Sequence, residues 1–280
     1  MKTGLVMEGG ALRGLFTCAI NDVLMENGIS FDGAVGVSAG ATFGCNIKSK
    51  QIGRPYRYNL KYNGDKRYKG FSSWIRTGNL FNVDFCYNEL PYKLDVWDEK
   101  TFAENPMEFY VVVTDMETGK AVYHKCTDGG REDIRWIQAS ASMPLASKPV
   151  EIGGRKYLDG GTSDSIPLKF LQDKGYDHVL VIETQPYDYV KQKQEYMGLI
   201  RRVYRKYPDF IKAIENRFIM YNEEKAYIRE QEKSGNVLVV RPDEALGISP
   251  LTKDPAEIKR VYEIGRRAGE KLLSRESWLR

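Results

Sequence analysis

Short apolar runs, each closed by glycine or polar residues, predict the strands of this protein. Runs of this length are typical of strands that are buried on both faces of a sheet. They lie at residues 4–8, 31–37, 109–113, 179–182 and 237–240. Between and after these runs, apolar residues recur at helical spacing and predict helices. The predicted helices span residues 12–28, 132–141, 167–174, 191–206, 209–231 and 254–274.

The alternation of these strands and helices predicts an α/β fold. It is typical of a doubly wound, mostly parallel sheet with helices on both faces. A turn at 117–120 predicts a hairpin that leads into residues 121–125. After about Glu183 long charged helices dominate the chain, and the Gln185–Pro186 pair interrupts the pattern. We therefore predict a first domain over residues 1–187 and a helix-rich C-terminal extension over 188–280, packed on that domain.

Residues 51–100 differ from the rest of the chain. They are rich in Tyr, Lys and Arg and show little apolar periodicity, which predicts a long irregular insertion. In a compact domain such an insertion is often a functional lid or a binding loop. A solvated surface excursion, packed by its own tyrosines, explains the same residues equally well.

The composition excludes several classes of protein. The chain carries 42 Lys+Arg against 38 Asp+Glu, and the resulting charge of +4 is too small to indicate a nucleic-acid partner. No apolar run approaches the ~20 residues that a membrane-spanning helix needs. The first residues, which reach an acid and a glycine pair at once, do not fit a signal peptide. The scattered Cys18, Cys45, Cys86 and Cys126 form no C-x-x-C pair, so we expect free thiols in a cytoplasmic protein.

The segment from Gly36 to Gly40 fits the pattern G-x-S-x-G, with Ser38 at its centre. It follows a predicted strand and opens a predicted helix. A serine on such a sharp turn is held in a strained backbone conformation, and the flanking glycines avoid clashes. The turn lies at the carboxyl end of a strand, where open α/β sheets place their sites. The context favours Ser38 as a nucleophile over a turn in which the serine only caps a helix.

A second glycine-rich turn, Gly9–Gly10–Ala11, follows the first predicted strand and opens a helix. It is not a Walker loop, since no Gly-Lys-Ser/Thr follows, and it lacks the central glycine of the dinucleotide fingerprint. The backbone N–H groups of such a turn form an anion site. Acyl transfer by a serine needs these donors for the oxyanion of its tetrahedral intermediate. A phosphate-binding turn without catalysis fits the same residues.

A serine nucleophile also needs a proton acceptor. His178 begins its predicted strand, so it lies at the amino edge of the sheet, whereas Ser38 lies beyond the carboxyl edge. A strand of about five residues spans ~17 Å, too far for a hydrogen bond. The other histidine, His124, follows the predicted hairpin and has no partner motif. Asp159, in Asp-Gly-Gly, is the better candidate for a base, although taken alone this tripeptide is typical of a plain turn.

Taken together, these motifs resemble those of the patatin-like phospholipases, which have a glycine-rich oxyanion turn, a G-x-S-x-G elbow and a late Asp-Gly-Gly/Ala in the same order. The small-residue segment 139–144 is also similar to one in that family, and the resemblance covers roughly residues 4–185. The helical tail resembles an extension of some bacterial members. The residues that carry the resemblance are Gly9, Gly10, Ala11, Arg13, Gly14, Gly36, Ser38, Gly40, Asp159, Gly160 and Gly161.

The resemblance implies a serine hydrolase of carboxylic esters, mainly acyl lipids, that uses a Ser-Asp dyad without histidine. Ser38 would attack the ester carbonyl, Asp159 would take the proton, and the backbone of the first turn would hold the oxyanion. Arg13 would orient that turn, meet a lipid phosphate or form a structural salt bridge. The resemblance implies no metal and no cofactor. Ala11 stands where a third glycine is common, and an alanine is tolerated there if φ is negative.

Two other functions remain open on the sequence. One is an α/β-hydrolase-type esterase that uses Ser38 with His178. The other is a non-catalytic anion- or nucleotide-binding protein that uses the two glycine turns.

A lipid substrate would also call for a membrane-facing surface. Residues 191–206 predict a basic amphipathic helix, which can lie on an anionic membrane. This would place a cytoplasmic enzyme peripherally at the inner membrane face. The more common alternative is that such a stripe packs on the core and leaves its charges in solvent.

Overall fold

Parallel strands form the centre of the structure. The structure is a computed structural model and describes residues 2–235 and 237–275. The parallel strands are β1 (Thr3–Met7), β2 (Gly33–Val37), β3 (Glu108–Asp115), β7 (His178–Ile182) and β8 (Val237–Val240). The antiparallel strands are β4 (Ala121–Cys126), β5 (Val150–Ile152) and β6 (Arg155–Asp159). In the described residues the sheet order is β5-β6-β3-β2-β1-β7-β8, with β4 also paired to β3.

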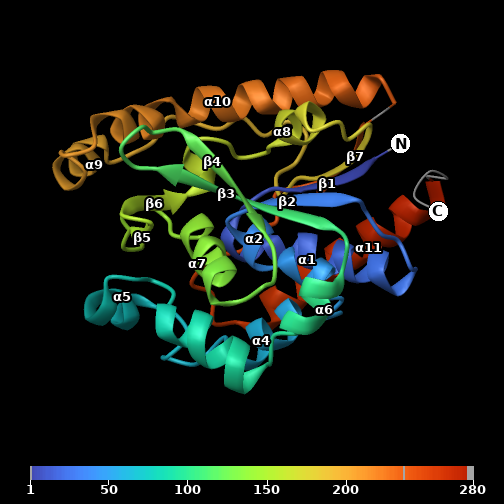
Figure 1. Cartoon of the computed structure of the whole chain (residues 1–280), viewed down its shortest axis with the longest axis horizontal. Helices are drawn as coiled ribbons and strands as arrows, with labels where there is room; N and C mark the ends of the chain where they lie inside the picture. Colours follow the sequence, from blue (N-terminus) through green and yellow to red (C-terminus); the bar gives the residue numbers. More distant parts are fainter. Residues whose placement is uncertain (1, 236, 276–280) are drawn as a thin grey trace.

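Helices cover both faces of this sheet (Figure 1). One face is covered by α1 (Gly14–Glu26) and α11 (Pro255–Arg275), and the other by α8 (Leu168–Asp173) and α10 (Pro208–Lys233). Because successive side chains of a strand point to opposite faces, Leu5 and Met7 of β1 enter the first core and Val6 enters the second. The predicted doubly wound α/β fold is confirmed. Its antiparallel strands all lie on the β3 side of the sheet.

The apolar runs located their strands to within a few residues, and the hairpin into β4 is also confirmed. The predicted helix over 12–28 begins with the short turn η1 (Ala11–Arg13) and continues as α1. The helix near 132–141 is α7 (Arg131–Ser140). The prediction of a helix over 191–206 is wrong for its first part, because only α9 (Met197–Val203) is helical. There the Lys191 backbone N–H and C=O both pair with the side chain of Asn222 on α10, which holds the chain extended.

The prediction that residues 51–100 are irregular is also wrong. This insertion contains α4 (Arg54–Tyr62), α5 (Phe71–Thr77), the π-helix η2 (Phe85–Leu94) and α6 (Glu99–Glu104). Its helices are too short to establish a clear 3.6-residue period. Their buried positions are largely aromatic, and Tyr58, Tyr62 and Tyr68 all belong to the core. The insertion forms the lower layer of the molecule in Figure 1, beneath α1 and α7.

The C-terminal residues pack closely on the rest of the chain. β8 extends the sheet beside β7, and α11 lies against α1. Gly265 permits this approach, because a Cβ there would come within 2.4 Å of the Phe16 carbonyl oxygen. The Tyr262 hydroxyl donates a hydrogen bond of 2.7 Å to the buried Asp22. The boundary near residue 187 remains a prediction. In the described part of the chain, no helix combines the length and apolar character needed to cross a bilayer.

Candidate active site

Ser38 occupies a sharp turn between β2 and the short helix α2 (Ala39–Thr42). Its backbone angles, φ 55° and ψ −117°, lie in a region that residues with a side chain rarely adopt. Neighbouring glycines make the turn sterically feasible. A Cβ on Gly36 would lie 2.2 Å from the Gly40 carbonyl oxygen, and one on Gly40 would lie 2.1 Å from the Met7 carbonyl oxygen. The strained turn expected from G-x-S-x-G is therefore present.

Asp159 ends β6 and lies on the antiparallel side of β3, opposite Val113. The Gly161 backbone N–H donates a 2.8 Å hydrogen bond to its Oδ1. Burial raises the pKa of Asp159 above its ordinary value, although the nearby Ser38 hydroxyl and Arg217 oppose the rise. Gly160 allows the close approach to β3, since a Cβ there would lie 2.1 Å from the Val112 carbonyl oxygen. A buried carboxyl beside a serine hydroxyl can exchange a proton with it.

The small-residue segment after α7 connects the two side chains. The Ser140 hydroxyl accepts a 3.0 Å hydrogen bond from the Ser38 backbone N–H. Two residues further on, the Ser142 carbonyl accepts a 2.8 Å hydrogen bond from the Asp159 backbone N–H. Ser140 is fully buried. The segment therefore fixes the position of Ser38 relative to Asp159, a role that the sequence resemblance did not identify.

The first glycine turn lies against Ser38. A Cβ on Gly9 would come within 2.8 Å of the Ser38 Cβ, so only glycine fits there. Ala11 has a φ of 49°, in the left-handed region that favours glycine. The expectation that an alanine fits here with a negative φ is therefore not met. The side chain of Glu8, just before the turn, accepts hydrogen bonds from the Thr184 backbone N–H and the Tyr221 hydroxyl. These bonds anchor the turn from behind.

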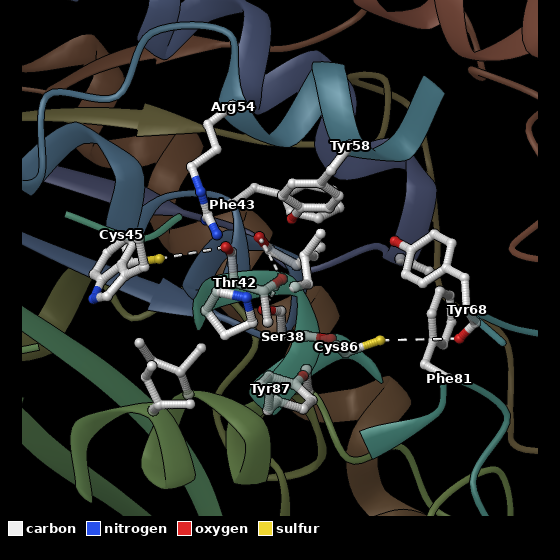
Figure 2. A pocket seen from close by; sticks show the side chains of 18 of the residues that line it. Ser38, Thr42, Phe43, Cys45, Arg54, Tyr58, Tyr68, Phe81, Cys86 and Tyr87 are labelled. Carbon is white, nitrogen blue, oxygen red and sulfur yellow. Dashed lines mark hydrogen bonds between the residues drawn. The ribbon is translucent and has the colours of Figure 1, made fainter. Parts of the chain in front are cut away.

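Two cavities meet at Ser38. The first has a volume of about 120 Å³ and is mainly apolar. Figure 2 shows Phe43, Tyr58, Tyr68, Phe81 and Tyr87 around it, with Ser38 at its wall. Most of its lining comes from the region after Ser38 and from the insertion 51–100, so the insertion covers this cavity. That arrangement supports the lid interpretation over a solvated excursion.

The second cavity, of about 320 Å³, is more polar and also contains Ser38 and Asp159. Three cationic side chains line it: Arg13 of the first turn, Lys191 of the segment before α9, and Arg217 of α10. Arg217 donates a hydrogen bond from Nε to the Gly161 carbonyl oxygen, next to Asp159. An anion in this cavity would therefore lie close to the serine hydroxyl.

Neither histidine lines either cavity in the described part of the chain. His178 pairs in register with Thr3 at the amino ends of β7 and β1, whereas Ser38 follows the carboxyl end of β2. This placement agrees with the predicted separation. His124 stacks on Trp136 and hydrogen-bonds to Asp133 at 3.0 Å, as expected for a structural residue.

One group of side chains among the described residues has the spacing of metal ligands: His124, Cys126 and Asp133. Its bonds are already used within the protein. Asp133 Oδ2 accepts three backbone N–H groups, and Oδ1 pairs with His124. The four cysteines are free thiols, as predicted.

Helix α10 supports the site from the C-terminal part of the chain. One of its faces carries Arg217, Tyr221, Glu224 and Lys225, and each contacts the carboxyl-end loops of the sheet. Tyr221 bonds to Glu8, the Glu224 carboxylate accepts the Ser165 and Ile166 N–H groups, and Lys225 pairs with the buried Glu183 at 2.9 Å. Sequence reasoning missed these residues because their spacing resembles any charged amphipathic helix.

The fold and this site define an α/β protein with a serine elbow at the carboxyl edge of its sheet. Residues 5–171 match the family model "Patatin-like phospholipase", which covers more than half of the chain. The chain therefore belongs to the patatin-like phospholipase family, and its class of activity is acyl-ester hydrolysis. Residues 207–279 match a second model, "Domain of unknown function (DUF6363)". This second match includes α10.

Several known proteins are similar to the chain. The uncharacterized protein YjjU of Escherichia coli is 25% identical over 98% of this chain and 77% of that protein. The lysophospholipase NTE1 of Debaryomyces hansenii is 24% identical over 98% of this chain, but the match spans only 18% of that protein. The solved structure of VipD from Legionella pneumophila aligns with a TM-score of 0.49 at 15% identity, over 98% of this chain and 67% of that one.

Proposed function

We propose that the chain hydrolyses carboxylic esters of acyl lipids with Ser38 as nucleophile and Asp159 as general base. One observation carries the proposal: Ser38 lies where an apolar and a polar cavity meet, and its hydroxyl faces a buried carboxyl. An ester bond at this point would have its acyl chain on the apolar side and its alcohol on the polar side. Lysophospholipase relatives, such as NTE1 of Debaryomyces hansenii, support a lipid substrate.

The reaction would proceed in two halves. Ser38 Oγ attacks the carbonyl carbon while its proton passes to Asp159, and the carbonyl oxygen becomes an oxyanion near the backbone N–H groups of Gly9, Gly10 and Ala11. The C–O bond to the alcohol then breaks, and Asp159 returns the proton to that alcohol. Water next attacks the acyl-serine and gives a proton to Asp159. Collapse of this second intermediate releases the carboxylic acid and returns the proton to Ser38.

A fluorophosphonate probe tests the nucleophile directly. The probe is expected to label the wild-type chain at Ser38 and to leave Ser38→Ala unlabelled, because only an activated serine reacts. Peptide mass spectrometry of the labelled chain locates the adduct. A folded wild-type protein that is not labelled would favour the non-catalytic anion-binding interpretation. Label on another serine would also contradict the proposal.

We further propose that the protein acts in the cytoplasm and contacts the membrane peripherally through α9. Ile200 of this helix is buried, but Leu199 and Val203 are about half exposed and Tyr196, just before it, is 73% exposed. Arg201 and Arg202 lie beside these exposed apolar side chains. Exposed apolar residues flanked by cations are typical of interfacial segments.

Binding to vesicles tests this contact. Leu199→Glu is expected to lower sedimentation with phosphatidylglycerol-containing vesicles several-fold, because it places a negative charge where an apolar side chain would enter the interface. Val96→Glu is the matched control, since Val96 is also exposed but lies in the insertion, on the opposite side of the sheet from α9 (Figure 1). Equal binding by the two variants would contradict a contact through α9.

A further inference from the structure

The polar cavity beside Ser38 holds an excess of positive charge. Arg13, Lys191 and Arg217 all line it, and in the described part of the chain none of the three forms an ion pair with an acidic side chain. The Nε atom of Arg13 is buried and has no hydrogen-bond partner among these residues. Two carboxyls, Glu8 and Asp159, also line the cavity, and Glu8 is already engaged by Tyr221 and Thr184. Three cations against two carboxyls leave the lining of this cavity with a net positive charge, which favours an anionic ligand.

Lys191 shows this charge excess most clearly. Its ammonium lies 4.6 Å from the centre of the ring of Tyr221, which also lines the cavity. Burial, together with Arg217 and Arg13, lowers the pKa of Lys191 to about 8, although Glu8 and Glu224 oppose this. A bound anion would stabilise the protonated amine. Arg217 bonds to the Gly161 carbonyl oxygen, two residues after Asp159, and the charges of Arg217 and Lys191 both lower the pKa of the Asp159 carboxyl.

Two of the three cations lie beyond the part of the chain that matches the patatin-like model, which ends at residue 171. Arg217 belongs to α10, within the match to the domain of unknown function over 207–279. Lys191 is held in place by α10, through the pairing of its backbone with the Asn222 side chain. The C-terminal extension therefore supplies part of the wall of the cavity that contains Ser38.

We propose that Lys191 and Arg217 of the C-terminal extension, together with Arg13, form a phosphate-recognition subsite for the alcohol side of the ester. A phosphate has several acceptor oxygens, and a fork of guanidinium and ammonium donors is the usual way in which proteins bind it. The extension would then determine which alcohol leaves, while the insertion 51–100 covers the acyl side. This inference rests on the proposed function, since it assigns a substrate class to the same site.

A matched pair of substrates tests the subsite: 1-decanoylglycerol 3-phosphate and 1-decanoylglycerol, which differ only in the phosphate. Wild type is expected to prefer the phosphorylated ester in kcat/KM by at least about tenfold, because charge-assisted hydrogen bonds to a phosphate are stronger than neutral ones. In Lys191→Met this preference should fall by about tenfold, mainly through KM. Methionine keeps an apolar stem against Tyr221.

Lys193→Met is the matched control, because Lys193 lies in the same segment, is exposed, and does not line the cavity. It should keep the wild-type preference. Arg217→Gln provides a second variant with the same expectation as Lys191→Met. Glycerol 3-phosphate should also inhibit hydrolysis of 1-decanoylglycerol by the unmodified enzyme competitively, which tests the subsite without any mutation.

The outcomes separate the two levels of the proposal. If wild type hydrolyses both esters equally and glycerol 3-phosphate does not inhibit, the phosphate subsite is wrong but the hydrolase remains. If Lys191→Met and Arg217→Gln lower the rates on both esters by the same factor, their role is structural and the subsite is overturned. If wild type hydrolyses neither ester and no fluorophosphonate label forms, the proposed function itself fails.

Discussion

Asp159→Asn is expected to lower kcat for a short p-nitrophenyl ester by about 10³- to 10⁴-fold. Loss of a positioned general base typically costs this much, and an amide cannot accept the proton from Ser38. Ser38→Ala should be at least as inactive. His178→Ala should keep the wild-type rate. His178 begins β7 at the amino edge of the sheet, whereas Ile182, four residues later, ends β7 at the carboxyl edge where the site lies. Initial rates of the four purified proteins provide the measurement.

The pH dependence gives an independent check of the same residue. Burial raises the pKa of Asp159 above its ordinary value, and the base must be ionised to act. The value of kcat/KM should therefore fall as the pH drops through this raised pKa, and the fall should begin at a higher pH than an ordinary aspartate would give. The residual kcat/KM of Asp159→Asn should not show this fall at low pH. An inactive but folded His178→Ala would contradict the dyad and restore the triad interpretation.

Loss of activity in Asp159→Asn should not reflect unfolding. A carboxyl whose pKa is raised by folding destabilises the folded state at pH values above its ordinary pKa, and this cost is lost as the pH falls from the folded pKa to the ordinary one. Replacing the carboxylate with a neutral amide removes the cost at neutral pH. Thermal unfolding of the variant should therefore occur at or above the wild-type temperature, which distinguishes a chemical defect from a structural one.

The parts of the site that could be predicted from the sequence are those built from backbone. Glycines at 36 and 40 are needed wherever a chain turns this sharply from strand to helix, and a buried parallel strand has a recognisable apolar run. Because parallel strands end at the same edge of a sheet, the turn after β1 and the turn after β2 were expected to lie side by side at the carboxyl edge. For the same reason the distance of His178 from Ser38 could be predicted before any coordinates, as the amino and carboxyl edges of one sheet are separated by the length of a strand.

The parts that could not be predicted depend on contacts between distant segments. Tyr221 reaches Glu8 across 213 positions of the chain, and Arg217 reaches Gly161 across 56. On a helix these residues follow the spacing of any charged surface, so their sequence gives no sign that they are directed at a site. The insertion was mispredicted for a different reason. Its helices bury tyrosines, which a hydropathy pattern does not separate from surface residues, and the apolar cavity forms only when these helices pack over Thr42 and Phe43.

Filling that apolar cavity is expected to shift the preference for acyl-chain length. Cys86 on η2 lines the cavity (Figure 2), and Cys86→Trp would occupy much of its volume. We expect the ratio of kcat/KM for p-nitrophenyl decanoate to that for p-nitrophenyl acetate to fall by about 100-fold. Each buried methylene contributes about 0.8 kcal/mol, so exclusion of three or four methylenes accounts for a change of this size.

Asn88→Trp is the matched control for this change, because Asn88 is exposed on the same π-helix and does not line the cavity. It should leave the chain-length ratio unchanged. Thermal unfolding of both variants separates loss of chain-length preference from overpacking, which typically costs about 1–3 kcal/mol. If folded Cys86→Trp keeps the wild-type ratio, the acyl chain does not enter this cavity. The insertion 51–100 would then cover a space that the substrate does not use, and the acyl chain would have to lie in the polar cavity beside Arg217 or outside the protein.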